Sequence, residues 1–212
     1  MKQTLLLTIL LAISIYTKSQ DTIRIIHTNF TTIFDKTLKY PVYVEWWDTR
    51  EKVSCSNPLP RKDQFKPDPE IPESTNLKID YFKSGYDRGH MCPAADNKCL
   101  GEQVLKECFY FSNMAPQTHS LNAGDWEKVE RLTRDLSIEN DSVHVWAGSV
   151  GVRTKIQSVS VPLKCWKVIH ILKTGEWYSY IMDNDTEQQA GVHSHEVNKL
   201  EVEKLTGFRF RR

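Results

Sequence analysis

The spacing of apolar residues changes several times along the 212-residue chain, and each change predicts a structural element. β-Branched and aromatic residues gather at 41–47 and at 143–147, which predicts a strand in each segment. Residues 166–172 and 177–182 have the same character and flank a short polar turn, so they are predicted to form a β-hairpin. We expect these strands to build an antiparallel sheet around the core.

A period typical of an amphipathic helix lies between these strands. Its inward positions recur at intervals of three and four residues and are Trp126, Val129, Leu132, Thr133 and Leu136. Asp125 precedes them and suits the N-cap or the first turn, where an acidic side chain is favourable. A second, shorter helix is predicted over 196–205, before Gly207. Helices and strands without βαβ spacing indicate an α+β domain, with the antiparallel sheet flanked by helices.

The first nineteen residues have the pattern of a secretory signal peptide, because Lys2 is basic, 5–15 are almost all apolar and the end is polar. The apolar run is too short to cross a bilayer, so no membrane anchor is expected. The mature chain, 20–212, is expected to be one secreted or periplasmic domain. Its segment 57–72, rich in proline and charge, is expected to be a long surface loop.

The balanced net charge disfavours a histone-like polyanion binder more than it disfavours an enzyme. The chain has 28 basic and 27 acidic residues, and removal of the signal peptide takes away Lys2 and Lys18, which leaves 26 basic residues. A mature chain with a formal charge of about −1 would need a local cluster of cations to bind a polyanion. The overall charge does not locate that cluster.

The mature chain contains five cysteines, which are Cys55, Cys92, Cys99, Cys108 and Cys165. In an exported protein they permit two disulfides and one free thiol, and the spacing does not determine the pairing. A fully reduced set of buried cysteines is the alternative. A zinc site that joins His90 to the middle three cysteines is a further alternative, but the chain lacks the paired CxxC pattern of such sites.

Candidate chemistry gathers near the middle of the chain. Hydrolysis of a phosphodiester needs an activated water, positive charge beside the phosphorus and stabilisation of the departing oxygen. His90 is a candidate general base because the reference pKa of histidine is close to neutral, and the Arg88 guanidinium can hold a phosphate. Asn113, Asn122 and Glu130 offer oxygen atoms of the kind that Mg²⁺ accepts.

Asn122 and Glu130 are eight residues apart, which is about 12 Å along a continuous helix. Both could not then bind one ion directly. Either the chain bends between Asn122 and Gly124 before the helix begins, or Glu130 acts through a metal-bound water. A third interpretation gives Glu130 only an ion pair with Arg134, at the i,i+4 spacing.

Several of these segments together carry a family resemblance. The segments are Asp87-Arg88-Gly89-His90, Phe111-Ser112-Asn113-Met114-Ala115-Pro116-Gln117, Leu121-Asn122 and Trp126 to Glu130. In this order they resemble the DNA/RNA non-specific endonuclease family, which has the ββα-metal fold. Further likeness runs from Arg61 and Phe65 to the segment 202–207 near the end, so it covers nearly the whole mature chain.

The resemblance implies a metal-dependent nuclease. It implies that His90 activates the attacking water and that Asn122 binds Mg²⁺ directly, with Mn²⁺ as a candidate substitute. Glu130 would hold the water shell of the metal. The expected substrates are DNA and RNA, bound through the phosphate backbone that both polymers share, with little sequence preference.

The resemblance also gives roles to the residues around this centre. Arg88 and Arg61 would contact the scissile or neighbouring phosphate and stabilise developing charge. Asn113 would lie beside the site and orient His90 or the substrate. Asp87 is expected to be a structural partner, and Gly89 is expected to let the backbone turn so that His90 faces the metal. Cys92 lies two residues after the candidate base, and nothing in the sequence explains it.

Two other functions remain open at this level. One is a catalytically silent nucleic-acid-binding module with the same fold, which the intact set of His90, Asn122 and Glu130 disfavours. The other is a phosphodiesterase that acts on small nucleotides. Fold-level resemblance alone does not decide between a polymer and a small diester.

Overall fold

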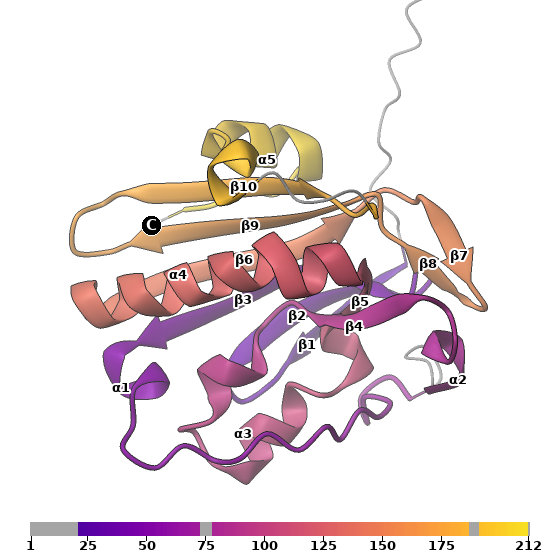
Figure 1. The fold of residues 1–212 in the computed structure, drawn as a ribbon, viewed down its shortest axis with the longest axis horizontal. Coiled ribbons are helices and arrows are strands. Elements are labelled where there is room, and N and C mark those ends of the chain that lie inside the picture. The colour runs from indigo at the N-terminus through magenta and orange to yellow at the C-terminus, as the bar shows by residue number, and fades with distance from the viewer. Residues whose placement is uncertain (1–20, 73–77, 187–190, 212) are drawn as a thin grey trace, which may run out of the picture.

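One antiparallel sheet, with strand order β1-β2-β3-β6-β9-β10, forms the centre of the molecule (Figure 1). Its strands are β1 (Thr22–Ile26), β2 (Phe30–Asp35), β3 (Tyr40–Thr49), β6 (Ser142–Val150), β9 (Lys164–Ile171) and β10 (Trp177–Asp183). The structure is a computed structural model and describes residues 21–72, 78–186 and 191–211. The signal peptide predicted over 1–19 lies outside the described residues.

Both faces of this sheet are buried, because alternate side chains of the central strands point to opposite sides. Val145 of β6 is paired with Ile169 of β9, and both belong to the larger apolar cluster of the core. The next pair, Trp146 and Val168, belongs to a separate cluster on the other face. Each face of the sheet therefore needs a covering layer.

α4 (Trp126–Asn140) covers one face and α5 (Lys199–Thr206) covers the other (Figure 1). Within α4, Trp126 and Val129 pack into the larger cluster. α5 begins with a capping box, in which the Asn198 side chain accepts from the amide of Leu200 and the Glu201 side chain accepts from the amide of Asn198. It ends at Gly207, whose φ of 75° is left-handed.

A second, two-stranded antiparallel sheet lies on the α4 side of the molecule. Its strands are β4 (Tyr86–His90) and β5 (Met114–Thr118), and α4 follows β5 after a short turn. His90 at the end of β4 is paired with Met114 at the start of β5. This ββα unit brings the end of β4 next to the first turns of α4.

Short elements connect these parts. The helices are α1 (Arg50–Val53), α2 (Lys78–Tyr81) and α3 (Glu102–Glu107), and a small hairpin joins β7 (Thr154–Ile156) to β8 (Val159–Val161). The tighter 3₁₀ turns are η1 (Ala94–Asn97), η2 (Phe111–Asn113) and η4 (Val192–His195), and η3 (Leu121–Asp125) is a wider π-helical turn. No helix in the described ranges is long and apolar enough to cross a membrane.

The predicted elements are confirmed in kind. The strands predicted at 41–47 and 143–147 lie inside β3 and β6, and the predicted hairpin is β9 with β10. The predicted helices are α4 and α5, although α5 begins at Lys199 rather than 196. Asp125 occupies the N-cap position without a side-chain cap, because its carboxylate accepts from Lys128 and from the amide of Gly191.

The cysteine expectations were wrong in both forms. Cys55 and Cys99 form a disulfide that ties the segment after α1 to the segment after η1. Cys92, Cys108 and Cys165 are free and buried. The zinc alternative was also wrong, because the Cys99 sulfur is bonded to Cys55 and cannot be a thiolate ligand.

Candidate active site

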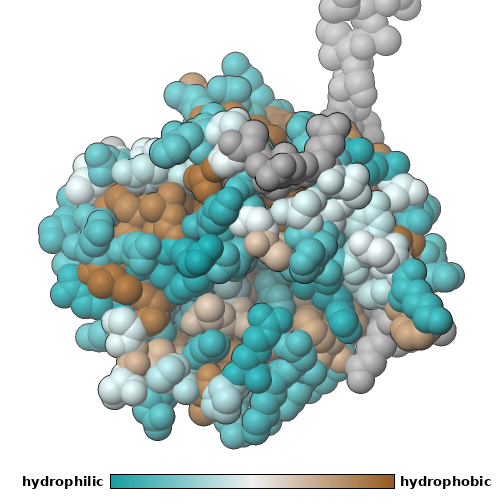
Figure 2. All heavy atoms as spheres, viewed as in Figure 1, coloured by the Kyte–Doolittle hydropathy of each residue, from teal (hydrophilic) through white to brown (hydrophobic). Residues whose placement is uncertain are grey.

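A hollow of about 770 Å³, open to solvent, lies between the end of β4, the segment after η1 and α4. Its lining residues are Arg61, Arg88, His90, Pro93, Ala94, Ala95, Asn122, Ala123, Glu127, Glu130 and Arg134. Figure 2 shows hydrophilic residues over much of the face on which α4 and the β4–β5 sheet lie. Five of the six residues predicted for the site meet here, and Asn113 is the exception.

His90 is held by aromatic neighbours at the inner wall of the hollow. Its ring lies 5.1 Å from the Phe109 ring and 5.7 Å from the Phe65 ring, and the Trp126 indole donates to its carbonyl oxygen. Burial, with Arg61 as the next contributor, lowers the pKa of His90 to about 3. The imidazole is therefore neutral at working pH, and its Nε2 has no hydrogen-bond partner among the described residues.

Gly89 is required for space rather than for a turn. β4 is regular at this residue, but a Cβ there would lie 1.9 Å from the Oε1 atom of Gln117 on β5. The Gln117 side chain thus occupies the space beside Gly89 that a larger residue would need. The expected role of Gly89 as a turning point is corrected by this contact.

The chain bends between Asn122 and α4, as the first of the three interpretations expected. Asn122 lies in the π-helical turn η3, and Gly124 in the same turn has φ −104° and ψ −116°, outside the helical range. Asn122 and Glu130 consequently line one hollow. The Asn122 amide nitrogen donates to Asp87, so its amide oxygen is the atom left for a cation. Asp87 is thus a structural partner, as predicted.

Glu130 does not form the predicted ion pair with Arg134. The Arg134 guanidinium instead binds Asp96 of η1 at 3.0 Å, and Asp96 is fully buried. Burial raises the pKa of Glu130 to about 7, while the nearby Lys167 opposes the increase. Behind Asp96 lies Asp48, whose pKa is raised well above its usual value by burial and by the Asp96 charge.

Lys167 is the least expected member of this group. It is fully buried on β9, and its Nζ atom lies 4.2 Å from the centre of the Trp126 ring and 5.8 Å from that of Trp46. Among the described residues the ammonium has no hydrogen-bond partner. Burial lowers its pKa, and Glu130 with Asp96 opposes that effect. The indole faces and two nearby carboxyl groups compensate its charge in place of hydrogen bonds.

Two arginines stand on the outer side of His90. The Arg88 guanidinium lies 4.3 Å from the centre of the Phe65 ring, and the Arg61 guanidinium lies 5.7 Å from that of Phe109. Arg61 is half exposed and pairs with Asp63 at 2.7 Å. A guanidinium that packs its face on a ring can still donate in its own plane to a phosphate, and at Arg61 the Asp63 carboxylate already takes the Nε donor.

Asn113 lies behind the site rather than in it. It is fully buried, and its amide accepts from the amide nitrogen of Cys92 and donates to the carbonyl oxygens of Cys92 and Cys108. These bonds fix the chain directly after His90. The position of Asn113 fits a residue that orients His90 from behind, and that role remains a prediction.

Sequence reasoning gave no role to Lys167 or Asp96. The signal for Lys167 was available in the alternation of β9, because Cys165, Ile169 and Ile171 share its parity and all point into the larger cluster. The alternation therefore predicts that the charge of a lysine at this position is buried. For Asp96 no local signal exists, since its partner Arg134 is 38 residues away.

Comparison with known proteins places the chain among nucleases. A sequence profile of the DNA/RNA non-specific endonuclease family matches residues 11–212. The mitochondrial nuclease EXOG of Danio rerio is 39% identical over 127 residues, covering 58% of this chain and 35% of that protein. Its human counterpart is 30% identical over 210 residues, covering 87% and 55%, and a nuclease of Nostoc sp. is 31% identical over 166 residues, covering 71% and 60%.

The chain spans about one third to just over half of the length of these mitochondrial relatives. A solved structure of the EndoG/EndoGI complex, described by its mechanism of EndoG inhibition, matches with a TM-score of 0.79 and 28% identity. The match covers 88% of this chain and 84% of that one, and it confirms the ββα-metal fold. Since the family profile covers nearly all of the sequence, this protein belongs to the DNA/RNA non-specific endonuclease family.

Proposed function

We propose that this protein is a Mg²⁺-dependent endonuclease that hydrolyses the phosphodiester bonds of DNA and RNA with little sequence preference. The observation that carries the proposal is the hollow itself. A neutral His90 lies in it with two arginines beside it, and with an amide oxygen and a carboxylate opposite. This set matches the base, the phosphate clamp and the cation site that the reaction needs.

The residues fit a hard cation of the magnesium type. Asn122 offers an amide oxygen, and Glu130 offers a carboxylate whose raised pKa makes it partly ionised near neutral pH. Mg²⁺ keeps several waters and accepts few protein ligands, so a site with one direct ligand is chemically sufficient. Within the described ranges no group of three His, Cys, Asp or Glu side chains could hold a metal. A bound cation would neutralise charge on the phosphate and the departing oxygen.

In the proposed reaction, Arg61 and Arg88 hold the phosphate while His90 takes a proton from the attacking water. A pKa of about 3 makes His90 a weak base in the free protein. Because the two arginines are among the causes of the low pKa, a bound phosphate would offset their charge and raise the pKa of His90. The base would thus become stronger when substrate is present.

Export of the mature chain is part of the proposal. It rests on the pattern of residues 1–19 and on the Cys55–Cys99 bond, since disulfides persist in oxidising compartments. Relatives named as mitochondrial make the compartment worth testing. N-terminal sequencing of the protein recovered outside the cytoplasm should begin close to residue 20; an uncleaved Met1 would contradict export.

The test of the activity is digestion by the purified mature chain, with Mg²⁺ and with a chelator. The substrates are supercoiled DNA, single-stranded DNA, RNA and a small chromogenic phosphodiester. Cleavage of the polymers that stops on chelation supports the proposal. Binding of polymers without cleavage would instead indicate a silent module, and hydrolysis of the small diester alone would indicate a nucleotide phosphodiesterase.

A further inference from the structure

A second hollow lies beside the active site, on the other side of one extended segment. Along 60–65 the side chains alternate, as they do in any extended chain. Arg61 lines the catalytic hollow and Phe65 packs against His90, whereas the even-numbered residues between Pro60 and Gln64 line the second hollow. The segment 60–65 therefore lies between the two hollows and contributes side chains to the walls of both.

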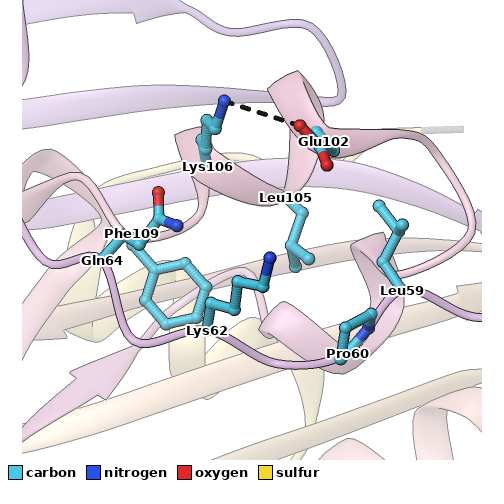
Figure 3. A pocket seen from close by; sticks show the side chains of 8 residues that line it. All are labelled: Leu59, Pro60, Lys62, Gln64, Glu102, Leu105, Lys106 and Phe109. Carbon is cyan, nitrogen blue, oxygen red and sulfur yellow. Dashed lines mark ion pairs between the residues drawn. The ribbon is translucent and has the colours of Figure 1, made fainter.

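The second hollow has an apolar interior and a cationic rim. The space within it and at its open mouth is about 560 Å³, and its lining residues are Leu59, Pro60, Lys62, Gln64, Glu102, Leu105, Lys106 and Phe109. Figure 3 shows Phe109, Leu105 and Leu59 around it, with the side chain of Lys62 reaching along it. Lys106 pairs only at 3.8 Å with Glu102, and Lys62 is exposed.

The two hollows share an aromatic wall. Phe109 lines the second hollow, and its ring also lies 5.1 Å from the His90 ring and 5.7 Å from the Arg61 guanidinium. A phosphate held by Arg61 at His90 would thus be one side chain away from the second hollow. A nucleoside attached to that phosphate is the part of the substrate that can reach it.

We propose that the second hollow is a subsite for the nucleobase next to the scissile phosphate, and that Lys62 binds the following phosphate. The inference rests on the proposed function and names how that site holds its substrate. Leu59 and Pro60 offer apolar surface to a base of any identity, above a floor formed by the buried Leu105 and Phe109, which suits a site without sequence preference. The Lys62 ammonium complements the polyanionic backbone that must leave the hollow.

The opposite side of the active site offers a weaker alternative. There Arg88 borders a hollow lined by Tyr81, Phe82 and Lys83, and Phe82 is 69% exposed. The Lys83 ammonium lies 5.3 Å from the Phe82 ring centre, much as the Arg61 guanidinium lies 5.7 Å from that of Phe109, so the two hollows differ in their walls rather than in this contact. A base there would meet one exposed ring rather than an enclosed apolar wall.

The test fills the second hollow and asks whether the loss depends on the base. Leu59→Trp does this from a partly exposed position, and Leu200→Trp on α5 is the matched control, since Leu200 is 54% exposed and far along the chain. The substrates are a twelve-residue oligothymidylate and an abasic chain with the same number of phosphates. We expect Leu59→Trp to raise the KM for the oligothymidylate about tenfold, in the range of one lost stacking contact.

The KM for the abasic chain should not change in Leu59→Trp, and Leu200→Trp should change neither value. An equal effect on both chains, or no effect, would overturn the proposal. So would a base-dependent loss in Phe82→Ala that is absent from Leu59→Trp. If Leu59→Trp loses native circular dichroism, Leu59→Phe replaces it in the same comparison.

Binding measurements separate this inference from the proposed activity. Fluorescence anisotropy of the two labelled chains with His90→Ala needs no turnover. If the wild-type protein cleaves neither chain but His90→Ala prefers the oligothymidylate and loses that preference with Leu59→Trp, the activity fails and the subsite stands. Equal affinity of His90→Ala for both chains would reject the subsite even if cleavage is observed.

Discussion

The two faces of the central sheet each hold a lysine over a tryptophan, in opposite circumstances. On the α5 face, Lys199 lies 5.0 Å from the Trp177 ring centre and pairs with Glu203 at 2.7 Å. On the α4 face, Lys167 lies 4.2 Å from the Trp126 ring centre, is fully buried and has no hydrogen-bond partner among the described residues. The same contact is satisfied on one face and left incomplete on the other.

The difference teaches where this fold accepts an energetic cost. A buried charge without hydrogen bonds is destabilising unless other charges compensate it, and an apolar side chain of similar size would serve the core as well or better. On the α5 face the buried Glu203 is paired with Lys199 and Arg209, and the rest of the contact is filled by Trp146, Trp166 and Phe210. The α4 face keeps the buried charge of Lys167 next to the candidate active site, where perturbed groups are expected to concentrate.

The largest expected effect removes the base on the α4 face. His90→Ala should lower Mg²⁺-dependent cleavage by roughly 10²–10⁴-fold, because proton transfer by a positioned base contributes that much. Binding of oligonucleotides should remain mostly intact. Normal turnover in this variant, measured on single-stranded DNA, would contradict the assignment of His90.

Glu130→Gln tests whether a group on the α4 face makes the unfolding free energy depend on pH. The pKa of Glu130 is about 7 in the folded chain and near 4.5 in the unfolded chain, so the folded state holds an extra proton between these values. Stability from this group is therefore lost as pH rises from 4.5 through 7.

Glu130→Gln should consequently be more stable than the wild-type protein at pH 8, by at most about 3 kcal/mol, and nearly equal to it at pH 4.5. Urea unfolding in the presence of a chelator measures both values. Equal unfolding free energies of the two proteins at pH 8 would show that the pKa of Glu130 is not raised in the folded chain.

A core substitution on the α5 face should lower the unfolding free energy without changing the activity. Val202→Ala removes buried methyl groups from the smaller cluster and should cost about 2 kcal/mol of unfolding free energy. The kcat of the folded fraction should not change, because α5 lies across the sheet from α4, whose side chains line the hollow. A large fall in kcat at full folding would mean that the two faces are coupled.

The matched pair Lys167→Met and Lys199→Met tests the comparison itself. Without the Lys167 ammonium, the pKa of Glu130 should rise further, so the acidic limb of the pH-activity profile should move to higher pH. We expect kcat at pH 7 to fall about tenfold, without a loss of stability. Lys199→Met should leave the profile unchanged and cost a few tenths of a kcal/mol. Parallel behaviour of the two variants would remove the distinction.

Much of the fold follows from local patterns in the sequence. The period of the segment 126–136 and the hairpin at 166–182 are strong signals, because each element buries one side of a regular structure. β5 escaped prediction because all five of its residues are buried and Pro116 interrupts the pattern. The strands β1 and β2 also went unpredicted, although β-branched residues fill them.

The candidate site was predictable as a set of residues but not as a set of contacts. Motif order brought Arg88, His90 and Asn122 together, and the structure places all three in one hollow. The Asp96 pairing and the Cys55–Cys99 bond depend on segments that are 38 and 44 residues apart. No local pattern encodes such distances.

Because of the turn η3, the site depends on the number of residues between Asn122 and Glu130, and not only on their identity. Each residue of a helix adds about 100° of rotation, so loss of the exposed Ala123 would turn Asn122 away from Glu130. Other small side chains could replace the exposed Ala123 at the wall of the hollow, yet its place in the count could not be omitted. A library of this segment should therefore accept small residues at 123 and reject every single-residue deletion.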